Sequence, residues 1–266
     1  MQNYLSFAAA ILYIFSLLRP LQSYASWVSL AAWLIHGWAL ALSLFDGGGL
    51  RVGFALMLSA ALWISVLVCW LEGRSYQLEG LRLFLLPHAA LMTILPCFFP
   101  GSLIALAGKP VMFPWHVIIA LLAYGTLTIA AFHAVIMSWQ DRLLHQRQLR
   151  HSWMSQLLDQ LPALLTMEKI LFRFILIGFI LLSLTVVSGV IFSEQVLGIA
   201  LKWWDHKTVF SLFSWVLFAV LLAGRYWRGW RGKTVLRFTL SGFVTLLLAY
   251  VGTRFVLEVI LHRSLI

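Results

Sequence analysis

Eight apolar runs dominate this sequence and restrict what it can fold into. Their approximate bounds are 4–18, 26–45, 53–71, 82–99, 114–138, 170–193, 208–224 and 236–258. A helix needs about 20 apolar residues to cross a bilayer, and backbone groups in lipid must be hydrogen-bonded within their own segment. We therefore predict an all-α fold, a polytopic membrane helix bundle with about eight transmembrane helices. The bundle is expected to form a single integral membrane domain over residues 1–266.

The composition favours a membrane protein over a soluble one. Of the 266 residues, 62% are hydrophobic and only 11% are charged, whereas a soluble domain carries about 25% charged residues. The net charge of +10 would suggest nucleic acid as the partner of a soluble protein. Here the basic residues lie mostly between apolar runs, where membrane topology and lipid headgroups account for them. We expect the lipid bilayer as a partner, and no nucleic acid.

Arginine and lysine are concentrated in the connections after the fifth and seventh runs. They are Arg142, Arg147, Arg150 and Lys169 in the first, and Arg225, Arg228, Arg231, Lys233 and Arg237 in the second. Short cytoplasmic loops carry an excess of lysine and arginine, so both connections are predicted to be cytoplasmic. Both termini are then extracytoplasmic. The longest polar connection, 139–169, is predicted to extend the fifth helix and to turn near Pro162.

Sequence motifs of soluble enzymes are missing. Cys69 and Cys97 lie in apolar runs without CxxC spacing, which indicates neither a disulfide framework nor a zinc site. The sequence has no GxxxxGK[ST] phosphate loop, no HExxH and no GxSxG. The N-terminus lacks the basic region of a signal peptide, so we expect the first apolar run to be retained as a span.

Three histidines are expected at the extracytoplasmic ends of three different spans, namely His116, His206 and His262. Two neutral imidazoles that face each other can bind a haem iron axially. Aromatic and cationic side chains at the same level suit a porphyrin face and its propionates: Trp115, Trp203, Trp204, Lys109, Lys202 and Lys207. The alternative is an ordinary aromatic belt with snorkelling lysines.

The densest group of such residues is the stretch Trp203-Trp204-Asp205-His206-Lys207. Asp205 is placed either to orient a histidine ring or to cap the helix that follows. In the last span, Arg254 and Glu258 are spaced for a structural i,i+4 ion pair.

Further histidines lie inside the spans, including His36, His88 and His133. Ionisable groups within spans usually face a bundle interior or a pocket, so each is a functional hypothesis. One possibility is that His36 and His88 line a path for haem or form a relay in a transporter of another small solute. The structural alternative is a neutral ring hydrogen-bonded between helices.

Taken together, these residues resemble the membrane cytochrome c assembly proteins (CcsA/CcmC-like), which handle haem through a tryptophan-rich WWD motif. The resemblance covers roughly residues 60–262. Its pattern consists of Pro114-Trp115-His116-Val117, Glu168-Lys169-Ile170-Leu171-Phe172-Arg173, Gly178-Phe179, Ser188-Gly189, Trp203-Trp204-Asp205-His206-Lys207-Thr208, Trp215 and Gly229-Trp230-Arg231-Gly232.

The resemblance implies a haem-binding protein of the bacterial inner (cytoplasmic) membrane, an assembly factor rather than a classical enzyme. The implied cofactor is a transient b-type haem, presented at the extracytoplasmic face for attachment to apocytochrome c. Apocytochrome c or other cytochrome c maturation proteins are the implied partners. His116 matches the position of the family's first axial histidine, and His262 lies close to the second.

Two departures from the family pattern point to the small HemX/YpjD-like branch. The tryptophan-rich loop is short, and His206 stands where many members have proline, which makes it a candidate substitute ligand. Because function depends on the site rather than on the fold, an alternative stays open. It is an accessory or regulatory membrane protein that acts through segment 139–169 on haem synthesis or on a transporter.

Overall fold

The computed structural model describes residues 2–18, 24–46, 49–72, 79–105, 113–145, 161–197 and 206–260. Helices account for most of this part of the chain, so the predicted all-α membrane bundle is confirmed. They are α1 (Gln2–Phe15), α2 (Ala25–Leu44), α3 (Phe54–Glu72), α4 (Glu79–Phe98), α5 (Phe113–His145), α7 (Leu164–Leu197), α8 (His206–Arg228), α9 (Lys233–Leu247) and α10 (Thr253–Phe255).

Within the described residues, seven helical segments are long and apolar enough to cross a membrane: α2, α3, α4, α5, α7, α8 and the continuous unit Lys233–Ile260. The first apolar run forms α1, which has 14 residues. At a rise of 1.5 Å per residue it is about 21 Å long, shorter than the roughly 30 Å hydrocarbon core. The eighth expected span is therefore present as a short apolar helix. By contrast, α5 has 33 residues and extends to His145, which confirms the predicted extension.

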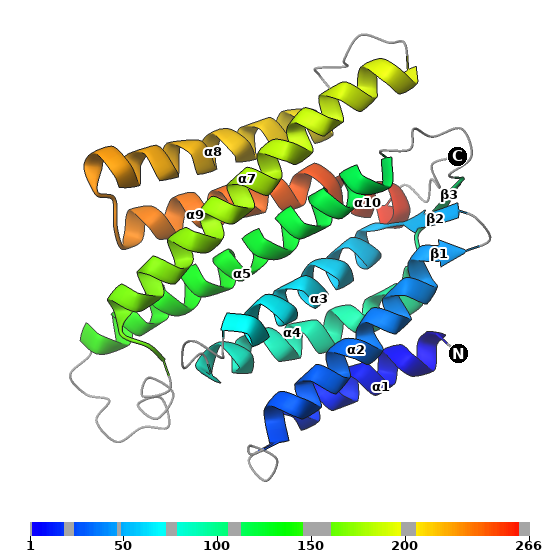
Figure 1. Ribbon diagram of the computed structural model, residues 1–266, viewed down its shortest axis with the longest axis horizontal. Helices are drawn as coiled ribbons and strands as arrows, with labels where there is room; N and C mark the ends of the chain where they lie inside the picture. Colours follow the sequence, from blue (N-terminus) through cyan, green and yellow to red (C-terminus); the bar gives the residue numbers. More distant parts are fainter. Residues whose placement is uncertain are drawn as a thin grey trace.

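The helices form two groups of four, each closed into a ring (Figure 1). In the first group, α1 packs on α2, α2 on α3, α3 on α4, and α4 back on α1. In the second group, α5 packs on α7, α7 on α8, α8 on α9, and α9 back on α5. The two groups meet mainly where α3 contacts α5.

A reciprocal tryptophan pair joins α2 to α3 within the first group. Trp33 Nε1 donates to the Trp63 carbonyl at 3.0 Å, and Trp63 Nε1 donates to the Trp33 carbonyl at 2.9 Å. The two rings stack with centroids 4.7 Å apart. Both indole donors are therefore satisfied inside an apolar layer, where an unpaired donor would be costly.

Close backbone contacts bring α3 and α7 against the middle of α5. A Cβ at Gly125 would lie 2.6 Å from the Ile64 side chain, and Ser65 Oγ donates to the Gly125 carbonyl at 2.9 Å. On the α7 side, a Cβ at Gly178 would lie 2.5 Å from Leu127. Small residues of this kind allow membrane helices to approach closely, and they make the middle of α5 tightly packed.

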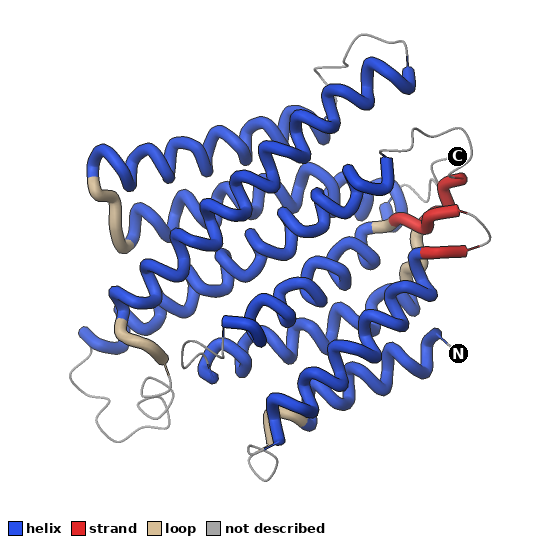
Figure 2. The backbone as a smooth tube through the Cα atoms, in the orientation of Figure 1, coloured by secondary structure: helices blue, strands red, loops and turns tan. Residues whose placement is uncertain are grey.

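A three-stranded antiparallel sheet lies at one end of the bundle (Figure 2). Its strands are β1 (Phe45–Asp46), β2 (Gly49–Val52) and β3 (Ser102–Ala105), and the sequence pattern did not predict them. Gly101 precedes β3 with φ +75°, and a Cβ there would lie 2.5 Å from the Val52 carbonyl oxygen. We call this the sheet end. The starts of α1, α5 and α8 lie at this end (Figure 1).

The opposite end of the bundle, which we call the arginine end, contains the turn between α8 and α9. Gly229 and Gly232 adopt positive φ angles there, a backbone conformation that glycine allows in a tight turn. Arg225 forms an ion pair with Glu168 of α7 and donates to the Trp230 carbonyl at 3.1 Å. These contacts fasten the turn to α7.

Candidate functional site

The structure describes some of the predicted haem-binding residues and not others. His116, His206, Trp115 and Lys207 lie at the sheet end, at the starts of α5 and α8. Outside the described residues fall Trp203, Trp204, Asp205 and His262, together with Lys109 and Lys202. The site can therefore be built from α5, α7, α8 and α9.

His116 is held by a serine on the neighbouring helix. Its Nδ1 lies 2.7 Å from Ser188 Oγ in α7. The Ser188 hydroxyl has one hydrogen, and the Thr185 carbonyl lies 3.0 Å away as an acceptor for it. When the hydrogen points to Thr185, the Ser188 oxygen accepts from His116 Nδ1–H, and the lone pair of the imidazole is then on Nε2. That tautomer is the one that binds a metal through Nε2.

Ser188 was not identified as functional from the sequence. It appeared there only as part of the Ser188-Gly189 pattern, with no role attached. The neighbouring glycine explains the pair, because a Cβ at Gly189 would lie 3.6 Å from Cε1 of His116. The imidazole thus packs directly on the α7 backbone, beside its serine partner. No local signal reveals this contact, because the two residues are 72 positions apart.

Side chains around His116 are less buried than those further along the same helices. No residue is buried in 113–122 of α5, 183–191 of α7 or 206–213 of α8. In 123–131 of α5, by contrast, every residue except Tyr124 is buried. The tight contacts of the second group of helices are therefore concentrated in its middle, and apolar surface is exposed near His116.

The last span deviates from α-helical geometry just after α9, toward the sheet end. Tyr124 of α5 donates its hydroxyl hydrogen to the Leu246 carbonyl at 2.6 Å, and the same hydroxyl contacts the Tyr250 backbone N–H. An α-helix would join these two backbone groups directly. Instead the phenol is inserted between them, and a π-helical turn follows at Leu248–Gly252. Insertions of this kind are a common cause of π-bulges, which often occur at functional sites.

The π-helical turn directs Tyr250 toward cations from two helices. Lys207 of α8 has its Nζ 5.9 Å from the Tyr250 ring centroid. Arg254 has its Cζ 5.7 Å from the same centroid and a hydrogen bond to the Tyr250 side chain. The predicted pair of Arg254 with Glu258 is confirmed, with Nη1 and Oε1 3.8 Å apart.

The other described candidates at the sheet end are more exposed than His116. His206 is the first residue of α8 and is exposed. Trp115 is 58% exposed. An exposed aromatic ring at a helix end fits an interfacial aromatic belt as well as a porphyrin site, so the position of Trp115 agrees with both.

His36 lies at the centre of the first group of helices. Its Nε2 is 2.9 Å from Ser59 Oγ, and its Nδ1 is 3.2 Å from the Tyr13 hydroxyl. Thr93 Oγ1 lies 3.2 Å from Nδ1. Each of α1, α2, α3 and α4 thus contributes one buried polar side chain to a single cluster. This arrangement matches the structural alternative, a ring hydrogen-bonded between helices.

His88 does not join that cluster. Its ring is exposed, lies 2.7 Å from the Phe84 carbonyl of its own helix, and packs edge-on against Phe132 of α5. His36 and His88 therefore share no hydrogen-bond partner and face different helices, so the predicted relay has no direct contact between its two members. His133 is fully buried against Phe174, with no hydrogen-bond partner for either ring nitrogen in the described part of the chain.

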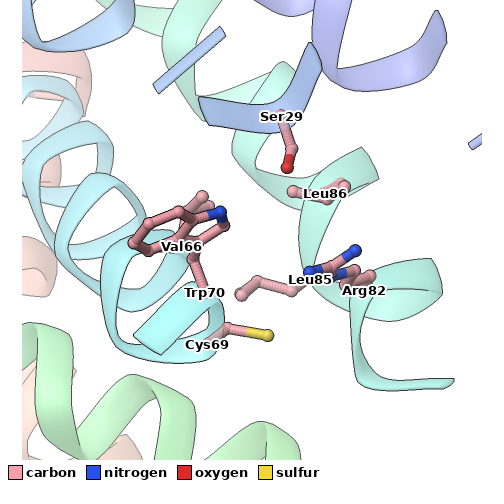
Figure 3. A pocket seen from close by; sticks show the side chains of 7 residues that line it. All are labelled: Ser29, Val66, Cys69, Trp70, Arg82, Leu85 and Leu86. Carbon is pink, nitrogen blue, oxygen red and sulfur yellow. The ribbon is translucent and has the colours of Figure 1, made fainter. Parts of the chain in front are cut away.

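A small pocket lies near the arginine end between α2, α3 and α4 (Figure 3). It holds about 220 Å³ of empty space, part of it open to the surroundings. Its lining includes Cys69, Trp70 and Arg82, and Arg82 donates to Ser26 Oγ at 2.9 Å. Only about 10 Å³ of this space could hold the centre of a water-sized group, so the pocket cannot hold a porphyrin, and it lies far along the bundle from His116.

Comparisons with known proteins place this chain in a family. The family described as "Cytochrome C assembly protein" matches residues 2–261. The "Inner membrane protein YpjD" of Escherichia coli (strain K12) is 33% identical over 177 residues, which are 66% of this chain and 62% of that protein. The "Cytochrome c biogenesis protein CcsA" of Prochlorococcus marinus (strain MIT 9515) is 35% identical over 91 residues, 34% of this chain and 28% of that protein.

The match to the YpjD relative thus spans less than two thirds of that relative's length. No solved structure matches this chain. The family match begins at residue 2 and so includes the first two apolar runs, which the resemblance seen in the sequence did not cover. On a match over nearly the whole chain, this multi-pass membrane protein belongs to the cytochrome c assembly protein family.

Proposed function

We propose that this protein binds haem at the sheet end and presents it for cytochrome c assembly. The observation that carries the proposal is the His116–Ser188 contact. It orients an imidazole that would bind iron through Nε2 when the ring hydrogen is on Nδ1, at the sheet end of a four-helix group. Haem is the cargo in this proposal, and His116 supplies one axial ligand to its iron.

The groups present at the site fit a haem. An imidazole nitrogen is a common axial ligand of haem iron. The apolar residues near His116 are only partly buried, which would leave apolar surface for a porphyrin face. Lys207 and Arg254 supply positive charge at the same end of the bundle, which suits the acidic edge of the cargo. His206 and His262 are the candidates for the second axial ligand.

Family membership and the names of the relatives support a cellular role and a location for the protein. The relatives named CcsA support a role in cytochrome c biogenesis. The relative named as an inner membrane protein supports the bacterial inner membrane as the location. With the charge bias of the loops, the sheet end would face the extracytoplasmic side, where apocytochrome c or other maturation proteins would receive the haem.

The proposal is tested by measuring the haem bound to purified protein. Wild type, His116→Ala, His206→Ala and His262→Ala are purified in detergent from haem-replete cells, and Soret absorbance is divided by protein concentration. The matched control is His145→Ala, at the opposite end of the helix that carries His116. We expect haem in the wild type and the control, and little in His116→Ala.

Loss of haem in His206→Ala or His262→Ala would identify the second ligand. A wild type that carries no haem and takes up no added hemin would exclude the proposed function. The regulatory alternative predicts a different result, in which replacement of segment 139–169 abolishes activity while the His116 variant retains it.

A further inference from the structure

Two cations from different helices converge on one tyrosine at the sheet end. Lys207 is the second residue of α8, and its Nζ lies 5.9 Å from the Tyr250 ring centroid. Arg254 is four residues beyond Tyr250, and its Cζ lies 5.7 Å from the same centroid. The π-helical turn that begins at Leu248 brings these groups together.

The ion pair of Arg254 leaves the guanidinium incompletely satisfied. Arg254 is only 5% exposed, and its Nε has no hydrogen-bond partner among the described residues. A charge-assisted N–H···O bond measures about 2.7–2.9 Å, whereas Arg254 and Glu258 are 3.8 Å apart. A buried cation is costly unless it is paired and hydrogen-bonded, so Arg254 has donor capacity that Glu258 does not use.

Glu258 is held in place by a second contact. Its carboxylate accepts a hydrogen bond from the Phe54 backbone N–H at the start of α3. A Cβ added at Gly53 would lie 3.2 Å from Glu258 Oε2, so the carboxylate rests on the chain just before α3. Glu258 therefore stands near Arg254 as a carboxylate without forming a close bidentate pair with it.

Helix geometry places Arg254 and His116 at similar depth in the bundle. The Tyr124–Leu246 hydrogen bond marks one level that α5 and α9 share. Because α5 and α9 are antiparallel (Figure 1), His116 and Arg254 each lie eight residues beyond that level toward the sheet end. His116 and Ser188 on α5 and α7, and Lys207 and Arg254 on α8 and the last span, therefore all lie at the sheet end of the same group of helices.

We propose that Arg254 and Lys207 form the carboxylate-binding part of this site and bind the propionates of the porphyrin cargo, beside the Tyr250 ring. This inference rests on the proposed function. Arginine presents a planar fork that matches a carboxylate, and lysine a flexible point charge. A porphyrin whose iron is bound by His116 would direct its acidic edge toward α8 and α9. Glu258 competes weakly for Arg254 until the cargo arrives.

The test compares two porphyrins that differ only in their carboxylates, ferric haem and its dimethyl ester. Each is titrated into detergent-purified protein and followed by absorbance. The variants are Lys207→Gln, Arg254→Gln, Arg254→Lys and Glu258→Gln, and the control is Lys233→Gln at the arginine end. Thermal unfolding of each variant, measured alongside, identifies any that fails to fold.

We expect the wild type and the control to bind ferric haem, the diacid, more tightly than its dimethyl ester. Loss of one charge-assisted contact should weaken diacid binding about tenfold or more in Lys207→Gln and Arg254→Gln and leave ester binding unchanged. Arg254→Lys should recover part of the preference, and Glu258→Gln should increase it. Lys207 lies at the start of a helix, so its variant is expected to fold.

The outcomes separate the two proposals. If the wild type binds both porphyrins equally, or if Lys207→Gln and Arg254→Gln keep the wild-type preference, the carboxylate site is excluded while haem binding stands. If both variants lose haem binding and ester binding equally, Lys207 and Arg254 have a purely structural role. That result would also exclude the carboxylate site. If the wild type binds neither porphyrin, the proposed function fails and this inference fails with it.

Discussion

Ser188 Oγ lies 2.7 Å from His116 Nδ1 and 3.0 Å from the Thr185 carbonyl oxygen. When the hydroxyl hydrogen points to Thr185, Ser188 accepts from Nδ1–H, and Nε2 is then the nitrogen that can bind a metal. A serine on α7 thereby orients a histidine on α5. Second partners of this kind orient metal-binding histidines and increase their basicity.

Replacing Ser188 with alanine should weaken haem binding without removing it. The variant keeps His116 but loses the acceptor that fixes its tautomer, and loss of such a partner typically costs about 10–100-fold in metal affinity. Titration with hemin measures the change. The matched control is Ser183→Ala on the same helix, whose hydroxyl bonds Trp215 and the Phe179 carbonyl. Equal hemin affinity in Ser188→Ala and wild type would argue against the role of Ser188.

Replacing Tyr124 with phenylalanine should destabilise the protein and alter α9. Its hydroxyl bonds the Leu246 carbonyl and the Tyr250 N–H, and leaving such buried groups unpaired costs about 1–3 kcal/mol. We expect a lower unfolding temperature in detergent and a changed rate of hydrogen exchange at the Tyr250 amide. The control is Tyr4→Phe, because Tyr4 is 81% exposed. Unchanged exchange at Tyr250 in Tyr124→Phe would show that the phenol does not maintain the π-helical turn.

His36→Phe should lower stability and leave haem binding largely intact. The substitution leaves the Tyr13, Ser59 and Thr93 hydroxyls without their shared partner inside the first group of helices, which is a known source of large destabilisation. The exposed ring of His88 offers a contrast, and His88→Ala should unfold near the wild-type temperature. A fully stable His36→Phe protein that has lost activity would instead support a relay.

The orientation of the bundle is tested by labelling single cysteines from one side of the membrane. In a background with Cys69 and Cys97 replaced by alanine, Tyr226→Cys at the arginine end and Leu103→Cys in β3 each supply one exposed thiol, since the side chains are 86% and 51% exposed. An impermeant reagent added to spheroplasts should label position 103 and spare 226, because short basic loops stay cytoplasmic. The opposite pattern would invert the predicted orientation.

The helices were predictable from sequence because a bilayer requires long apolar segments, and the spacing of Arg254 and Glu258 predicted their ion pair. The strands were not predictable, since two to four residues carry too little alternation to register as a pattern. The roles of Ser188 and Tyr124 were not predictable for another reason. Ser188 contacts His116, which is 72 residues away, and Tyr124 contacts Leu246, which is 122 residues away. Only the packing of antiparallel helices brings these groups together.

Binding of haem iron by His116 at the sheet end can be tested by chemical rescue with free imidazole. His116→Gly removes the imidazole and leaves a space that free imidazole can enter. The Soret band of hemin-loaded wild type should be lost in His116→Gly and restored when imidazole is added, while imidazole should leave the wild-type spectrum unchanged. A His116→Gly protein that keeps the full wild-type Soret band without imidazole would contradict the account.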